Sequence, residues 1–169
     1  MAAGMGIPEV IIEELLQRFG FVPNLLAAMS ESPEVLRFYL AGQEIMAKSS
    51  LSPKELEAVQ ITISQYNGCG YCVAEHGDAA RAIGISKEDV AALQAGEIPS
   101  DYGLATVVQA ARLILEKRGQ LSTGDLDLLG ALGIGKRRLY DLIGVIALST
   151  VTNYIDHIAQ SDVDPQYMG

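Results

Sequence analysis

Residues 52–76 read SPKELEAVQITISQYNGCGYCVAEH and contain the signals of two helices joined by a tight turn. Ser52 followed by Pro53 is typical of a helix start, because serine caps free N–H groups and proline fits the first turn. The pair Asn67-Gly68 is a turn signal that ends this first helix at about Tyr66. The stretch therefore predicts two helices that meet at a short, glycine-containing turn.

Similar start and stop signals recur on both sides of this stretch and predict an all-α chain. β-Branched residues cluster at Val145–Thr152, but the flanking helical periodicity and the lack of a partner strand argue against a strand there. We predict a compact single-domain helical bundle of about seven to eight helices over residues 1–169. The expected helices are Pro8–Phe19, about 33–48, about 53–66, about 69–84, Lys87–Gln94, Asp101–Arg118, about 123–132 and about 136–160.

Composition excludes several classes of protein. The 169 residues are 49% hydrophobic, which is typical of a folded chain, and the net charge of −9 disfavours nucleic-acid binding. The apolar, uncharged stretch Leu142–Ile155 is too short to span a membrane, and no signal peptide is recognisable. Two cysteines are too few for a disulfide-stapled scaffold. We therefore expect a cytoplasmic protein with neither a membrane nor a nucleic acid as partner.

Cys69, Cys72 and His76 fall on one side of the second helix in residues 52–76. At about 100° per residue the three positions share an arc of about 60°. Cys69 lies near the helix N-terminus, where the helix dipole stabilises a thiolate, while His76 can reach the thiol of Cys72 four residues earlier. The dipole thus favours Cys69 as the more reactive thiol and the histidine favours Cys72, so spacing alone leaves the attacking cysteine open.

Glu57 joins this group if the two helices pack antiparallel about the turn. In one unbroken helix Glu57 would lie about 18 Å from Cys69 along the axis. After a reversal at Asn67-Gly68 it lies opposite about residue 77, next to His76. A carboxylate, an imidazole and a thiol in that order form a proton relay that generates a thiolate.

A thiolate beside a second cysteine suggests peroxide chemistry. The thiolate attacks the O–O bond of a small hydroperoxide, the second thiol condenses with the sulfenic acid to a disulfide, and an external dithiol reduces that disulfide. A structural zinc site would need four ligands, and only His76, His157 and carboxylates could add to the two cysteines, so we expect no metal and no cofactor. We expect His157 to serve as a capping, interface or pocket-edge residue, and Tyr66 and Tyr71 to be packing residues.

Glu57 followed by Cys69-x-x-Cys72-x-x-x-His76 resembles the alkylhydroperoxidase D-type (AhpD-like) proteins of the carboxymuconolactone decarboxylase family. Lys117-Arg118-Gly119 and Thr152–His157 extend this resemblance, which covers Ser32 to Asp164. It implies an all-α fold, assembly as trimers or hexamers, and thiol peroxidase activity. It also implies that Cys72 attacks, Cys69 resolves, and Glu57 with His76 relays the proton.

In the best-known members of this family the reductant is a lipoyl-bearing protein and the partner is a peroxiredoxin. Those members place a second histidine next to the attacking cysteine, where this chain has Tyr71. Because a tyrosine with an ordinary pKa of about 10 is a poor base at neutral pH, the relay is expected to be weaker.

Two alternative functions stay open. One is a carboxymuconolactone decarboxylase-like lyase, against which the retained cysteines and the lack of Arg or Lys in residues 57–76 both count. The other is a non-catalytic redox switch whose disulfide alters an oligomer interface. Catalytic turnover with a dithiol reductant separates the peroxidase from the switch. The apolar segment Leu139–Ile155 also predicts a homo-oligomer.

Overall fold

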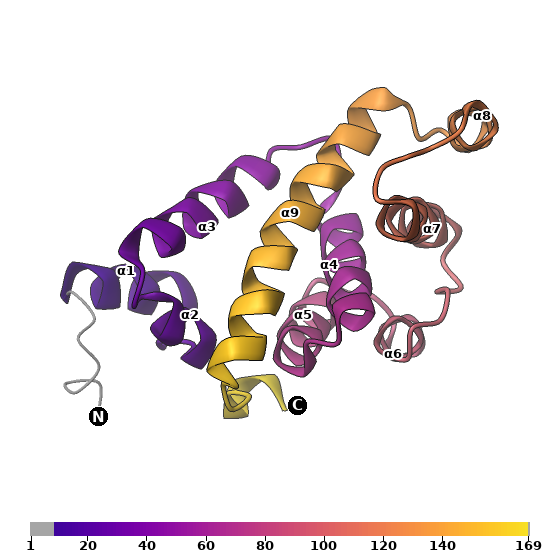
Figure 1. Ribbon diagram of the computed structural model, residues 1–169. Helices are drawn as coiled ribbons and strands as arrows, with labels where there is room; N and C mark the ends of the chain where they lie inside the picture. Colours follow the sequence, from indigo (N-terminus) through magenta and orange to yellow (C-terminus); the bar gives the residue numbers. More distant parts are fainter. Residues whose placement is uncertain (1–8, 169) are drawn as a thin grey trace.

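The computed structural model describes residues 9–168 and shows an all-α protein, as predicted (Figure 1). The described part has nine α-helices, one more than the upper end of the prediction, because the short helix α2 carries no clear sequence signal; the 3₁₀ helix η1 was not expected either. The start of the first expected helix at Pro8 lies outside the described residues. The elements are α1 (Glu9–Phe19), α2 (Asn24–Met29), α3 (Pro33–Met46), α4 (Pro53–Asn67), α5 (Gly70–Ala82), α6 (Lys87–Gln94), α7 (Tyr102–Lys117), α8 (Thr123–Ala131), α9 (Lys136–Ala159) and η1 (Pro165–Tyr167).

The turn between α4 and α5 forms for the reasons that the sequence indicates. Ser52 caps α4 through a reciprocal pair of bonds, because its Oγ accepts from the Glu55 amide and the Glu55 carboxylate accepts from the Ser52 amide. Gly68 ends α4 with a φ of 78°, a left-handed conformation that glycine adopts without strain. Cys69 then begins α5, which packs against α4.

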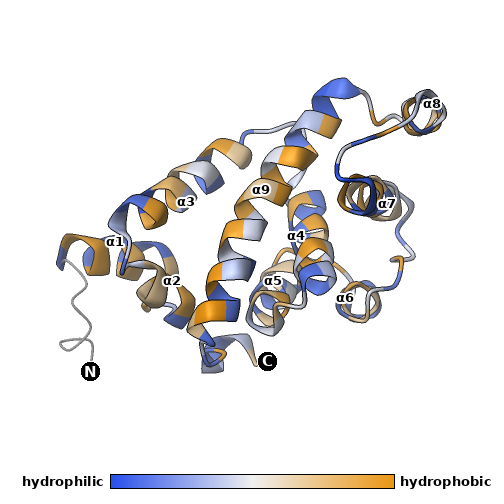
Figure 2. Ribbon diagram, in the orientation of Figure 1, coloured by the Kyte–Doolittle hydropathy of each residue, from blue (hydrophilic) through white to orange (hydrophobic). Residues whose placement is uncertain are grey.

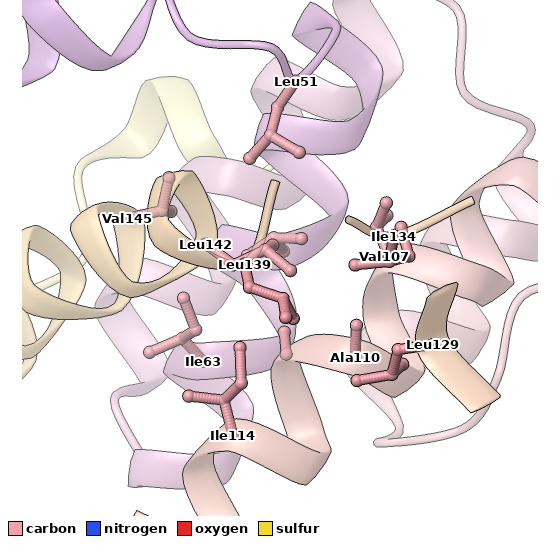
Figure 3. Close-up of a cluster of buried hydrophobic side chains, with 12 residues drawn as sticks. Leu51, Ile63, Val107, Ala110, Ile114, Leu129, Ile134, Leu139, Leu142 and Val145 are labelled. Atoms are coloured by element: carbon pink, nitrogen blue, oxygen red, sulfur yellow. The ribbon is translucent and has the colours of Figure 1, made fainter. Parts of the chain in front are cut away.

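The long helix α9 runs through the middle of the molecule in Figure 1. It packs against α4 and α7 on one side and against α2 and α3 on the other. In Figure 2 the helices alternate orange and blue along their length, the pattern of amphipathic helices that bury one face. Figure 3 shows one resulting core, in which side chains from α4, α7, α8 and α9 meet. Its buried members are Leu51, Val59, Ile63, Val107, Ala110, Ala111, Ile114, Leu129, Ile134, Leu139, Leu142 and Val145.

Within residues 9–168, α9 is also the one helix long and apolar enough to cross a membrane by length and composition. It packs against five other helices, α2, α3, α4, α5 and α7, and this packing buries part of its apolar surface. The segment Val145–Thr152 is helical, which confirms the rejection of a strand there.

The buried stripe of α9 changes character along the helix. Its first half buries Leu139, Leu142, Val145 and Leu148, all of them apolar. Its second half buries polar residues at the same helical spacing: Ser149, Thr152, Asn153 and Asp156. Buried polar groups need hydrogen-bond partners, so this second half indicates where a polar site lies within the fold.

Candidate active site

The two cysteines lie at the start of α5, and both are free thiols with no exposed surface. Cys69 is the N-cap residue of α5, and its Sγ accepts a hydrogen bond from the Cys72 backbone amide at 3.2 Å. This donor and the positive end of the helix both stabilise negative charge on the Cys69 sulfur. The side chains of Leu25, Val163 and Tyr167 pack with the cysteines and cover them.

Glu57 and His76 meet across the α4–α5 contact, as the antiparallel arrangement predicts. Glu57 Oε2 lies 3.0 Å from His76 Nδ1, and the Gln60 amide nitrogen lies 3.0 Å from both ring nitrogens. Burial lowers the pKa of His76, but the hydrogen bond and charge of Glu57, with the charges of Glu75 and Cys69, outweigh it and raise that pKa to about 9. His76 is therefore an imidazolium at neutral pH, paired with the Glu57 carboxylate.

The expected line from Glu57 through His76 to Cys72 is only partly formed. Among residues 9–168, no hydrogen bond joins His76 to either thiol. A hydrogen bond with Cys69, followed by burial, raises the pKa of the Cys72 thiol, and a hydrogen bond with Asn153 acts in the opposite direction. The hydrogen bond with Cys69 and burial thus both act against a thiolate at Cys72.

Two site residues that the sequence reasoning missed come from α9. Asp156 Oδ2 accepts a hydrogen bond from the Cys69 thiol at 3.4 Å. Asn153 is fully buried, donates to Ser64 Oγ at 3.1 Å and accepts from the Asn67 amide at 2.9 Å. The helical spacing of buried positions in α9 is the signal that could have found both residues.

His157, the neighbour that the sequence reasoning considered, lies outside the cysteine site. Its side chain is exposed and its ring stacks on that of Tyr154, with the ring centroids 6.0 Å apart. His157 thus lies at the surface of α9, and its expected capping, interface or pocket-edge role stays a prediction.

Tyr71, which stands between the cysteines, ties the C-terminal segment to the site. Its hydroxyl donates to Asp164 Oδ2 at 2.5 Å, and the same carboxylate oxygen accepts from the Asn24 backbone amide at 3.0 Å. Burial and the Asp164 hydrogen bond raise the pKa of Tyr71, so its hydroxyl stays protonated. Tyr71 is thus a packing residue, as expected, and its ring also contacts that of Tyr167 edge-on.

A cavity of about 350 Å³ lies on the other side of the Glu57–His76 pair, and neither cysteine lines it. Its polar lining residues include Tyr39, Glu57, Gln60, Glu75 and His76. Burial raises the pKa of Glu75, which has no hydrogen-bond partner among residues 9–168. The apolar lining includes Phe19, Leu40, Met46, Leu56, Ile83, Val145 and Leu148. No group of three or more His, Cys, Asp or Glu side chains in the described chain is arranged to hold a metal ion.

Comparisons with known proteins agree with this architecture. The model of the carboxymuconolactone decarboxylase family matches residues 33–117. A comparison with curated proteins gives no match. A peroxidase-related protein from Silicibacter sp. TM1040 is 22% identical, with a TM-score of 0.83 over 97% of this chain and 90% of its own. A peroxidase-related alkylhydroperoxidase AhpD core protein from Ralstonia eutropha JMP134 is 18% identical, with a TM-score of 0.85 over 99% and 90% of the two chains.

The same fold also supports a different described activity. The debrominase Bmp8, in a Cys-to-Ala variant bound to 2,3,4-tribromopyrrole, is 17% identical, with a TM-score of 0.70 over 94% of this chain and 86% of its own. At these identities the structural neighbours establish the fold, and the reaction has to be inferred from the residues of the site. The family model covers half of the chain and includes Glu57, both cysteines and His76. The chain belongs to the carboxymuconolactone decarboxylase family, with an AhpD-like fold.

Proposed function

We propose that the protein is a thiol-dependent peroxidase that reduces hydroperoxides through a dithiol–disulfide cycle of Cys69 and Cys72. The observation that carries the proposal is the pair of free, buried thiols at the start of α5, close to the Glu57–His76 ion pair. Such a pair can give up two electrons by forming a disulfide, which protects both sulfur atoms from overoxidation. The resemblance to AhpD-like proteins assigns attack to Cys72 and resolution to Cys69.

In the proposed cycle, Cys72 attacks from its minor thiolate form, because the hydrogen bond with Cys69 and burial raise its pKa and keep the thiol form predominant. Its sulfur attacks the distal oxygen of the hydroperoxide and the O–O bond breaks. Cys72 becomes a sulfenic acid, and the leaving alkoxide takes a proton. His76 is a suitable donor, because at neutral pH it is an imidazolium held by Glu57. Cys69 then displaces the oxygen from Cys72 as water, and an external dithiol reduces the disulfide.

The test combines intact mass with turnover. Reduced protein is treated with one equivalent of cumene hydroperoxide, and the proposal expects a loss of two hydrogens confined to the Cys69–Cys72 peptide. Dihydrolipoamide should then sustain peroxide consumption over many cycles. Disulfide formation without turnover would favour the redox switch, and unreacted thiols would refute both.

Single serine variants test the roles of the two cysteines. Cys72→Ser should abolish peroxide reduction, whereas Cys69→Ser should stop at a sulfenic acid that dimedone traps. The Cys69→Ser/Cys72→Ser double variant is the control for thiol-independent loss of peroxide. A sulfenic acid trapped in Cys72→Ser instead would assign attack to Cys69. The hydrogen bond from the Cys72 backbone amide to Cys69 Sγ gives that outcome a structural basis, because it stabilises a Cys69 thiolate.

The lyase alternative finds less support in the cavity beside His76. An anionic lactone acid in this cavity would face the carboxyl groups of Glu57 and Glu75. Apart from His76, the cationic residue among its described lining is Arg18, which already pairs with Glu44 at 3.6 Å. Decarboxylation of a small lactone acid by the purified protein would overturn this preference.

The partners in this proposal are a dithiol reductant, for which the resemblance suggests a lipoyl-bearing protein, and further copies of the chain. Large apolar side chains on the surface support self-association, since water-exposed apolar area favours burial. They include Phe38, Ile45, Tyr140, Ile143, Tyr154 and Ile158. Light scattering after size-exclusion chromatography tests the expected trimer or hexamer.

A further inference from the structure

Asp156 is a buried carboxylate in direct contact with one of the two reacting sulfur atoms. Its side chain projects from α9, and Asp156 is 9% exposed. Oδ2 accepts from the Cys69 thiol at 3.4 Å, and Oδ1 accepts from the Ser161 backbone amide at 3.3 Å. None of the ion pairs formed by residues 9–168 includes Asp156, so these two donors are its hydrogen-bond partners there.

A buried Asp156 carboxylate is energetically unfavourable unless the proton of the Cys69 thiol is shared with it. A carboxylate can only accept hydrogen bonds, and a buried one without a cationic partner is unfavourable. The thiol of Cys69 supplies the one transferable proton in contact with Asp156. Asn153, three residues earlier on the same face of α9, donates to Ser64 Oγ and lowers the pKa of Cys72. The carboxylate of Asp156 is the α9 group in hydrogen-bond contact with Cys69.

We propose that Asp156 is the general base for Cys69, separate from the Glu57–His76 pair. This inference rests on the proposed peroxidase function and assigns a catalytic residue to its second step. Asp156 takes the proton from the Cys69 thiol as the Cys69 sulfur attacks the sulfur of the Cys72 sulfenic acid. The S–S bond forms, the S–O bond breaks, and the thiol proton and the departing hydroxide leave as one water, which restores the Asp156 carboxylate.

The opposite reading of the same contact makes the opposite prediction. If Asp156 only repels the charge of a Cys69 thiolate, removing its charge speeds disulfide formation. If it is the base, removing its charge slows that step by about 100-fold, the lower end of what a positioned base contributes. The sign of the effect therefore separates catalysis from simple electrostatic repulsion.

The experiment is a rapid-quench time course of full-length Asp156→Asn after one equivalent of cumene hydroperoxide. Mass spectrometry with dimedone follows the sulfenic acid, and thiol loss follows the disulfide. We expect an attack rate within about twofold of wild type and disulfide formation slower by about 100-fold. Asp156→Glu should recover part of the lost rate, and Asp162→Asn, an exposed change in the same C-terminal segment, should match wild type.

The normal attack rate also shows that the Asp156→Asn variant is folded. Unchanged or faster disulfide formation in this variant, with wild type reacting normally, would overturn the role of Asp156 alone. Slower attack with unchanged resolution would overturn it as well, because Asp156 would then serve an attacking Cys69. If wild-type thiols do not react with the peroxide at all, the proposed function fails, and this inference fails with it.

Discussion

Replacing Glu57 by glutamine removes the carboxylate that keeps His76 charged. The pKa of His76 is raised from 6.5 to about 9, although burial pushes it down, because the hydrogen bond and charge of Glu57 outweigh the burial. Glutamine keeps the size of the side chain and loses both the charge and the ionic hydrogen bond. We therefore expect the pKa of His76 to fall in Glu57→Gln, because burial then opposes the charged form with less compensation.

The same shift predicts a pH dependence of folding stability. A group whose pKa is higher in the folded state stabilises that state below its unfolded pKa and loses this contribution as the pH rises through its folded pKa. For His76 the window runs from 6.5 to about 9, which corresponds to about 3 kcal/mol. Wild type should lose this amount across the window, whereas Glu57→Gln should lose little of it.

Two measurements check this prediction. The chain has two histidines, so NMR titration of the imidazole signals is simple to assign, with His157→Gln identifying the exposed one. Urea unfolding of both proteins under reducing conditions at pH 6, 7.5 and 9.5 gives the stability difference, in which contributions common to both proteins cancel. A wild-type His76 that titrates near 6.5, or parallel stability curves for the two proteins, would refute the reasoning.

Three further predictions concern the framework around the site. Tyr71→Phe keeps the ring contact with Tyr167 but leaves Asp164 without its hydroxyl donor. It should lower the free energy of unfolding in urea by about 1–3 kcal/mol and speed alkylation of the cysteines by iodoacetamide. Tyr66→Phe, at a half-exposed position, should change neither property. Leu142→Ala empties a fully buried position in the core between α4, α7 and α9 and should cost about 2–5 kcal/mol, against a much smaller loss for the exposed Ile143→Ala. Ser52→Ala removes the cap of α4 and should lower stability by about 1 kcal/mol, and an unchanged unfolding midpoint would show that the capping box is energetically unimportant.

The helices were predictable because their signals are local. Lys87–Gln94 matches its expected bounds, and α4, α7 and α9 differ from theirs by a residue or two, since Ser, Asp and Pro at starts and Gly at ends act within one turn of the chain. The six-residue α2 was missed because so short a segment contains less than two turns of periodicity. Its first residues matter nonetheless, since Leu25 covers the cysteines.

In the candidate site, too, the contacts between residues close in sequence were predictable and the contacts between distant residues were not. Glu57 and His76 were paired from spacing alone because a two-residue turn fixes how α4 and α5 face each other, and the 3.0 Å contact confirms that geometry. Asp156 and Asn153 lie more than 80 residues along the chain from the cysteines, and no local pattern measures that separation. Asp156 precedes His157 on α9 by one residue, and adjacent helical residues differ in direction by about 100°, so Asp156 faces Cys69 while His157 lies at the surface.

By itself, the sequence determined the all-α architecture, the CxxC dithiol and the pairing of Glu57 with His76, because each depends on contacts within about 20 residues. Only the tertiary structure decided the environment of each thiol. It placed Asp156 in contact with Cys69 and joined the Tyr71 hydroxyl to Asp164. It also raised the pKa of His76 through the hydrogen bond with Glu57. Those properties depend on burial and on charges brought from distant segments, and burial is a property of the packed molecule as a whole.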